Sequence, residues 1–311
     1  MSMILFILAA VAVMTAVSGM YVFVLACVRR KELAWLNESA MKDAGNEKYF
    51  KYILASHNWL LGHDFQDVYI RSFDGLKLHG YWVPAKNPRG TVLLAHGYRS
   101  TALLDLGFAF EFYYSRGFNL LIPQQRCHGE SQGKFITFGV KESKDMLSWI
   151  RYHNDVFGEK PMLLNGISMG ASSLLYLADE KLPDNVKGIV ADCGFTSPKD
   201  IISEVYKRII HLPVIPTLWA VEFFTRVLAG FSLEEKDTRK SLAKSMLPVL
   251  LIHGKNDGFV PCQMSVDAYN ACEGVKELLI IDNADHGLSF LVDTTKYVCT
   301  VDRFINNILE A

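Results

Sequence analysis

Apolar residues run without interruption through the first part of the chain. Residues 4–28, ILFILAAVAVMTAVSGMYVFVLACV, carry no charged side chain. At a rise of about 1.5 Å per residue, a helix of this length exceeds the hydrocarbon core of a bilayer, which is about 30 Å thick. The pattern therefore predicts one membrane-spanning helix over residues 4–28.

From residue 68 onward, short apolar runs alternate with longer stretches of helical spacing. This alternation is typical of an α/β protein with a mostly parallel sheet and helices on both of its faces. The predicted strands are residues 68–72, 76–83, 91–95, 119–122, 162–166, 188–191, 248–252 and 278–281. The predicted helices are residues 103–114, 141–157, 168–180, 262–271 and 293–308.

Two further segments differ from this rhythm. Residues 29–67 mix charged with aromatic and aliphatic side chains, which predicts a helical connector between the membrane and the main domain of residues 68–311. Residues 194–246, approximately, take the place of a single crossover helix and contain helical patterns at 205–212 and 218–231. We interpret this insertion as a small helical lid.

Basic residues follow the apolar run as RRK, and none precedes it. Because basic flanks stay on the cytoplasmic side of a membrane, this asymmetry predicts a cell-membrane protein with an outside amino terminus and a cytoplasmic main domain. A cleaved signal peptide normally has Lys or Arg before a shorter apolar stretch. Two alternatives remain: an uncleaved anchor whose domain faces outward, and a lipoprotein signal, since residues 24–27, VLAC, resemble a lipobox ending in Cys27.

The composition excludes several classes of function. A formal net charge of -1 and an isoelectric point near 6.8 give no field that would attract nucleic acid. The 6 cysteines form no CxxC pair, so we expect separate thiols, a pattern that favours a reducing compartment. No ligand cluster or phosphate-binding glycine loop is visible, and we therefore expect no metal and no organic cofactor.

Residues 166–170, GISMG, match the pattern G-x-S-x-G. Such a short match is weak alone, but an apolar strand pattern precedes it at 162–164 and a helix-forming stretch follows it. This strand–turn–helix setting is that of a nucleophile elbow, which presents a serine at the amino terminus of a helix. Ser168 is therefore the candidate nucleophile, at a position where backbone N–H groups favour a developing negative charge.

A serine hydroxyl needs a general base, and the base needs an acid that orients it. Asp257 lies in HGKNDGFVP after the seventh predicted strand, and His286 lies in DHG after the eighth. Both loops follow the carboxyl ends of strands, at the same sheet edge as the elbow. The order Ser, Asp, His along the chain is also the one expected for a fold with a nucleophile elbow. His253 is an alternative base, and Asp192, after the sixth strand, is an alternative acid.

Two loops complete the predicted site. LAHGY at 94–98 ends the third strand in a turn, where we expect the N–H of Tyr98 to pair with that of Met169 as an oxyanion hole. We interpret His96 as a brace for this turn. The loop QRCHGES at 125–131 is predicted to shape the floor of the site, and Cys127, which lacks a strand–turn–helix setting, is a weak alternative nucleophile.

Taken together, these motifs resemble the α/β-hydrolase superfamily over about residues 68–311. The chain looks most similar to bacterial membrane-anchored or cytoplasmic serine hydrolases grouped with esterases, acylaminoacyl-peptidase-like proteins and depalmitoylases. The resemblance implies Ser168 as nucleophile, Asp257 as acid, His286 as base, and the amides of Tyr98 and Met169 as oxyanion donors. Cys127 departs from the pattern, because the matching loop often has glycine there.

The sequence thus predicts a membrane-anchored serine hydrolase that cleaves a carboxylic ester or thioester through an acyl-enzyme. Its expected substrate is a small-molecule or lipid-like acyl ester. The apolar lid could line an acyl pocket, rest on the bilayer, or simply pack over the sheet. A serine peptidase or amidase remains open as an alternative, as does a non-catalytic membrane-bound scaffold that kept the fold.

Overall fold

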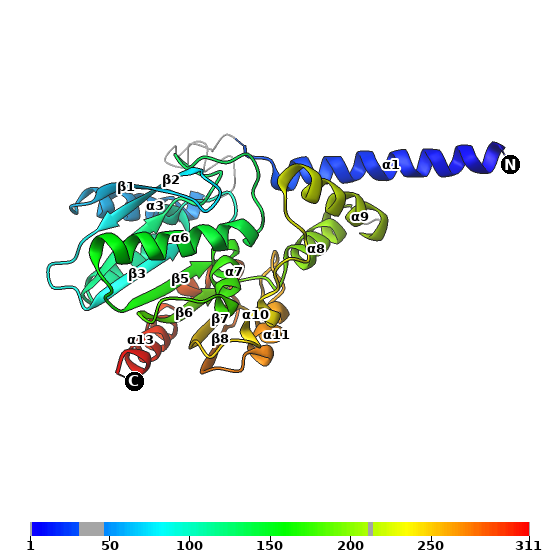
Figure 1. Ribbon diagram of the computed structural model, residues 1–311. Coiled ribbons are helices and arrows are strands. Elements are labelled where there is room, and N and C mark those ends of the chain that lie inside the picture. The colour runs from blue at the N-terminus through cyan, green and yellow to red at the C-terminus, as the bar shows by residue number, and fades with distance from the viewer. Residues whose placement is uncertain (1, 31–46, 211–213, 311) are drawn as a thin grey trace.

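A computed structural model describes residues 2–30, 47–210 and 214–310 of the chain. Its centre is an eight-stranded sheet in the order β1-β2-β4-β3-β5-β6-β7-β8 (Figure 1). The pairs β1–β2 and β2–β4 are antiparallel, and all other neighbours are parallel. The strands are β1 (Gln66–Arg71), β2 (Lys77–Val83), β3 (Gly90–Ala95), β4 (Phe118–Pro123), β5 (Met162–Ile167), β6 (Val186–Asp192), β7 (Val249–Gly254) and β8 (Lys276–Ile281). The predicted fold class and each predicted strand are confirmed.

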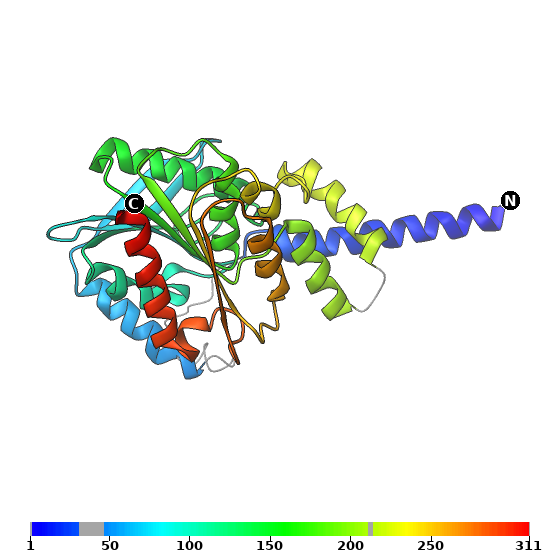
Figure 2. The ribbon, with the colours of Figure 1, turned by 90° about the horizontal axis from the view of Figure 1, so that it is seen from below.

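Helices cover both faces of the sheet (Figure 2). Alternate side chains of β3 point to opposite faces, so Val92 and Leu94 enter one hydrophobic cluster while Leu93 and Ala95 enter the other. The first cluster lies under α3 (Glu47–Leu61), α5 (Gly107–Tyr114) and α13 (Thr294–Glu310). The second lies under α6 (Val140–Phe157), α7 (Met169–Leu175) and α11 (Gln263–Ala271).

One predicted helix, 103–114, is divided in the structure. A short α4 (Ala102–Asp105) ends at Leu106, whose φ of -125° lies outside the helical range, and α5 begins at Gly107. A Cβ at Gly107 would lie 1.8 Å from Ser56 Oγ, so α3 packs against α5 at a spacing that only glycine permits. The division therefore creates a docking position for α3.

The segment predicted to be a lid forms a cap of four helical pieces. They are α8 (Pro198–Ile210), α9 (Val214–Phe224), a π-helical turn (Thr225–Ala229) and α10 (Thr238–Leu242). Beside the cap runs α1 (Ser2–Cys27), which extends far from the body of the molecule (Figure 1). This is the apolar helix predicted from residues 4–28, and Met3–Cys27 has the length and composition of a membrane span.

The carboxyl-terminal part of α1 packs against the cap. Ser18 Oγ and Thr217 Oγ1 are 2.9 Å apart, and a Cβ at Gly19 would lie 2.3 Å from the Cβ of Ala220. Farther along the helix, Phe23 and Cys27 are fully buried in a third hydrophobic cluster shared with the cap. The last turns of α1 are therefore part of the folded body.

Hydrogen bonds also tie the end of α1 to the loop that follows β3. The Tyr98 hydroxyl donates to the carbonyl of Ala26 at 2.7 Å, and Arg99 Nη2 donates to the carbonyl of Leu25 at 2.7 Å. These groups satisfy carbonyls that the end of a helix leaves without an intrahelical partner. The loop after β3 and the end of α1 thus form one hydrogen-bonded unit.

A buried ion pair lies in the loop after β4. The Arg126 guanidinium binds Asp145 of α6 through two hydrogen bonds, of 2.6 and 2.7 Å, and also contacts Asp74. The side chains of Arg126 and Asp145 are 4% and 0% exposed. Removing one partner of such a pair leaves an uncompensated charge in the interior.

We therefore expect Arg126→Ala to lower the free energy of unfolding by about 3–5 kcal/mol. Lys255→Ala is the matched control, because the Lys255–Asp282 pair is exposed on both sides and should contribute less than about 1 kcal/mol. Urea unfolding of both variants measures the difference. Equal decreases in the free energy of unfolding would show that the buried pair stabilises the protein no more than the exposed pair does.

Candidate active site

Ser168 occupies a sharp turn between β5 and α7. Its φ of 54° and ψ of -120° are unusual for a residue other than glycine. Two glycines make this turn sterically possible: a Cβ at Gly166 would lie 2.6 Å from the carbonyl carbon of Gly170, and one at Gly170 would lie 2.1 Å from the carbonyl oxygen of Ala95. The helix thus begins directly beneath the serine hydroxyl.

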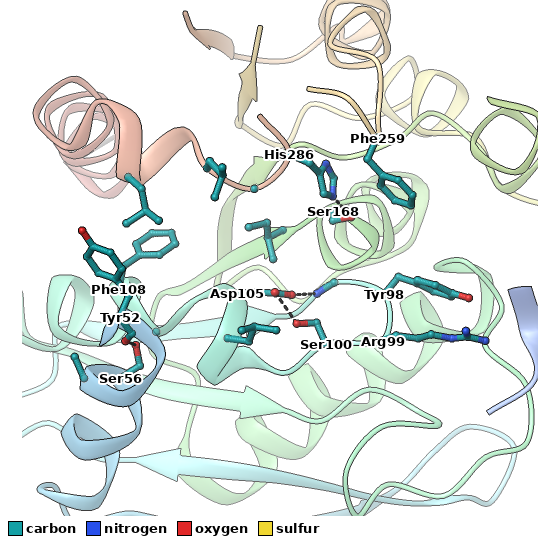
Figure 3. Close-up of a pocket in the computed structure, with 18 of the residues that line it drawn as sticks. Tyr52, Ser56, Tyr98, Arg99, Ser100, Asp105, Phe108, Ser168, Phe259 and His286 are labelled. Carbon is teal, nitrogen blue, oxygen red and sulfur yellow. Dashed lines mark hydrogen bonds between the residues drawn. The ribbon is translucent and has the colours of Figure 1, made fainter. Parts of the chain in front are cut away.

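The structure brings Ser168, His286 and Asp257 together (Figure 3 shows the first two). His286 Nε2 lies 2.9 Å from Ser168 Oγ, and its Nδ1 lies 2.7 Å from Asp257 Oδ2. Since an ionised carboxylate only accepts hydrogen bonds, Nδ1–H donates to Asp257 and the Ser168 hydroxyl donates to Nε2. The imidazole therefore has the tautomer that a general base requires.

Asp257 is held from several directions. Its Oδ1 accepts the N–H groups of Phe259 and Val260, both at 2.8 Å, and its Oδ2 also lies 3.1 Å from His253 Nε2. Burial alone would raise the pKa of Asp257, but the hydrogen bonds from His253 and His286 outweigh it and hold the pKa well below its ordinary value. The carboxylate is therefore ionised wherever the protein is folded near neutral pH.

The alternative acid and base are placed elsewhere. His253 Nε2 contacts Asp257 and its Nδ1 lies 2.7 Å from Ser265 Oγ, so both of its ring nitrogens have partners other than Ser168. Asp192 accepts from Ser289 Oγ at 3.2 Å, and its backbone carbonyl accepts the N–H of Ser168. Burial raises the pKa of Asp192 to about 6. His253 therefore helps to position Asp257, and Asp192 helps to position Ser168.

The alternative nucleophile Cys127 is buried in the third hydrophobic cluster, together with Phe23 and Phe138. Burial raises the pKa of its thiol to about 12. Because the thiolate is the reactive form of cysteine, this environment makes Cys127 a poor nucleophile near neutral pH.

The turn after β3 lies directly beside the nucleophile. A Cβ at Gly97 would lie 3.3 Å from Ser168 Cβ. Within the described part of the chain, the backbone N–H groups of Tyr98 and Met169 donate to no acceptor, so both are free for a ligand. His96 braces the turn from behind, with Nδ1 2.8 Å from the carbonyl of Gly97 and Nε2 accepting the N–H of Gln125.

Asp105, at the end of α4, fixes the same turn and was not anticipated from the sequence. Its Oδ2 accepts the N–H of Gly97 at 2.7 Å, and its Oδ1 accepts the hydroxyl of Ser100 at 2.6 Å (Figure 3). Burial raises the pKa of this carboxyl group, and the hydrogen bonds from Ser100 and Gly97 oppose that effect. No spacing or motif marks Asp105, because its role arises from the division between α4 and α5.

A cavity of about 560 Å³ opens in front of Ser168. None of its described lining residues comes from the cap. Instead, α3 forms one wall, although the sequence suggested only a connector there. Many of its lining residues are apolar or aromatic, among them Tyr52, Ala55, Trp59, Leu104, Phe108, Ile167, Leu288 and Leu291.

Cys193, Asp257 and His286 are the one group of potential metal ligands among the described residues. Cys193 Sγ lies 4.0 Å from His286 Nε2, and burial raises the pKa of its thiol well above the ordinary value. A protonated thiol is a poor metal ligand, and the imidazole already faces Ser168. The arrangement therefore suits activation of a hydroxyl group better than metal binding.

Comparison with known proteins places this geometry in context. Residues 86–220 match the family described as serine aminopeptidase, S33. The Bacillus subtilis protein YqkD is 28% identical over 78% of this chain and 79% of its own length. The Pyrococcus furiosus esterase Pf2001 superposes with a TM-score of 0.66 at 24% identity, covering 81% of this chain and 95% of the esterase. Est1E of Butyrivibrio proteoclasticus, solved with ferulic acid bound, has a TM-score of 0.62 at 20% identity, covering 78% of this chain and all of that one.

Replacing Asp105 should test the role of the turn. Asp105 holds the turn that carries Tyr98, the expected oxyanion donor, through its bonds to Gly97 and Ser100. Since loss of one oxyanion donor typically costs about 10²–10³ in kcat, we expect the indirect change Asp105→Ala to lower kcat for nitrophenyl butyrate by about 10–100-fold. KM should change little, because the cavity wall is otherwise intact. The control Ser100→Ala removes one bond to Asp105 but keeps the bond to Gly97, and should retain most activity. A rise in KM at unchanged kcat would assign Asp105 to substrate binding instead.

Proposed function

Because the chain is an α/β-hydrolase in fold and in sequence likeness, we propose that it is a serine hydrolase acting on a carboxylic ester or thioester. The observation that carries this proposal is the continuous contact from Asp257 through His286 to Ser168. Three loops far apart in the sequence supply these side chains. Their distances and tautomer are those needed to activate a serine hydroxyl.

The reaction follows from this geometry. Ser168 Oγ attacks the acyl carbonyl while His286 Nε2 accepts its proton, and the Asp257 carboxylate stabilises the resulting imidazolium. The N–H groups of Tyr98 and Met169 hold the oxyanion. The imidazolium then protonates the leaving alcohol or thiol as the acyl-enzyme forms. Water, deprotonated by His286, attacks that acyl-enzyme, and release of the carboxylic acid restores Ser168.

The cavity favours an acyl group with apolar character. Leu104, Phe108 and Leu291 line the cavity, Phe108 lies on the side away from Arg99 (Figure 3), and we place the acyl chain against these three residues. A peptidase that recognises a substrate amino terminus would need an uncommitted carboxylate in the cavity. Glu111 is bonded to Trp59 Nε1, and Asp105 is bonded to the turn. We therefore favour esters and thioesters over amides.

We further propose that α1 anchors the protein in the cell membrane with the catalytic domain in the cytoplasm. Burial of Phe23 and Cys27 against the cap supports a retained helix, since cleavage would remove part of a packed cluster. It also disfavours a lipid on Cys27. Arg29 and Arg30 directly follow the helix, on the side expected to stay cytoplasmic.

Ser168→Ala should abolish labelling by a fluorophosphonate probe and lower ester turnover by about four to six orders of magnitude. The control Ser148→Ala alters a serine of α6 that bonds only to the carbonyl of Lys144. It should label as the wild type does. Thermal unfolding confirms that each variant is folded. A wild-type protein that resists the probe would be a non-catalytic scaffold, and the proposal would fail.

Leu291→Trp should narrow the apolar end of the cavity. On a nitrophenyl ester series we expect kcat/KM for octanoate to fall about tenfold or more, with acetate changed less than about threefold, because only the longer chain reaches the new ring. Val292→Trp is the control, since Val292 adjoins Leu291 in α12 (Ser289–Val292) but is exposed. If acetate and octanoate fall equally, the acyl chain lies elsewhere.

A further inference from the structure

The cap presents an apolar face that the cavity does not use. Ile215, Trp219 and Phe223 of α9 recur at every fourth position and are all exposed, and Val227 continues the series in the π-helical turn. Trp219 is 72% exposed. Side chains spaced in this way lie on one side of a helix. An apolar stripe of this kind in contact with water is unusual and indicates an interaction surface.

Charge is absent from this face. Within α9 only Glu222 is charged, and it is turned toward the cap: its carboxylate accepts from Ser232 Oγ at 2.7 Å and from the N–H of Leu233 at 2.8 Å. Arg226 also binds Glu222. The outward side of α9 is therefore free of ionised groups over its whole length.

The helix α9, which carries the stripe, packs side by side with α1, so each position on α9 has a neighbouring position on α1. Thr217 contacts Ser18, Ala220 contacts Gly19, and Phe224 lies against Phe23, so the two helices run in the same direction. Figures 1 and 2 agree that α9 lies beside the half of α1 nearer the body. What surrounds that half of α1 must also meet α9.

The length of α1 indicates how far a bilayer around this helix would extend toward the cap. Residues 3–17 precede the contacts with the cap, and at about 1.5 Å per residue they span about 22 Å. A hydrocarbon core of about 30 Å needs about 20 residues, so it extends along α1 to about residue 22. That level lies beside α9. Tyr21 and Val24 of α1 are exposed at the same level and need the same apolar cover.

We propose that the face formed by Ile215, Trp219, Phe223 and Val227 is embedded in the lipid bilayer. This inference rests on the proposed membrane anchoring by α1 and extends it to a second element. Ile215, Trp219 and Phe223 enter the hydrocarbon of the cytoplasmic leaflet. Arg226, whose side chain is 62% exposed, and Val227 follow Phe224 and therefore lie at the level of the headgroups. A helix with one apolar face and an aromatic ring near the interface is suited to this position.

The arrangement brings the cavity close to the membrane surface. Tyr98 and Arg99 line the cavity and also bond to the last carbonyls of α1. The same two residues thus mark both the end of the anchor and one end of the substrate site. An amphiphilic acyl ester at the lipid surface therefore needs to travel only a short way to Ser168.

Trp219 provides a direct test. The whole chain is reconstituted into phosphatidylcholine–phosphatidylglycerol vesicles, with and without bromine on the acyl chains, and the emission of Trp219→Phe is subtracted from that of the wild type. This subtraction removes the emission of the other 4 of the 5 tryptophans. Bromine quenches only on close contact, so we expect the Trp219 emission to fall at least about twofold in brominated vesicles.

The matched control is Met246→Trp in the Trp219→Phe background, because Met246 is 76% exposed but lies outside α9. Its emission should change little. If bromine quenches Trp219 no more than it quenches the tryptophan at position 246, the inference is overturned. A second copy of the chain that covers this face in place of lipid would give that result.

Two readouts separate this inference from the proposed function. Flotation of the vesicles reports the anchor, and fluorophosphonate labelling reports Ser168. Flotation and labelling without quenching overturn only the embedded cap. Quenching without labelling leaves the embedded cap intact and removes the proposed chemistry. Failure to float removes the anchor and the embedded cap together.

Discussion

The buried carboxylate of Asp257 is the constraint on which the site depends. Two backbone N–H groups bind Oδ1, while His253 and His286 both contact Oδ2. His286 is partly exposed and lies on a loop after β8, where its ring also contacts the edge of Phe259. An ionised, immobile partner sets both the tautomer and the orientation of the imidazole, and thereby the 2.9 Å contact with Ser168.

The sheet and the three proposed catalytic positions could be predicted because local signals determine them. A buried parallel strand must be a short apolar run, and a close turn before a helix needs glycine at 166 and 170. Asp105 and α3 had no such signal. Asp105 faces Gly97 only because α4 ends at Leu106, and α3 reaches the cavity only because Gly107 leaves room for Ser56. Contacts created by packing leave no periodic trace in the sequence.

The helix α1 is attached to the α/β domain more closely than a flexible tether would be. The Tyr98 hydroxyl and the Arg99 guanidinium bond to carbonyls at the end of α1, while the Tyr98 N–H faces the site of the proposed oxyanion. Ile136 also donates its N–H to the carbonyl of Cys27. The end of α1 is therefore hydrogen-bonded to the turn that carries a proposed oxyanion donor. Removing the helix would expose the third hydrophobic cluster as well as remove the proposed anchor.

The apolar residues of the cap divide into two sets with different explanations. Val221 and Phe231 are buried in the same cluster as Phe23 and help to attach the cap to α1. Trp219 and Phe223 lie outside that cluster, although the Phe223 ring contacts Phe224, and in water their exposure would favour aggregation. A bilayer explains them together with the exposed side of α1 at the same level, because one lipid phase covers both helices. A protein partner on α9 alone would leave the apolar surface of α1 without cover.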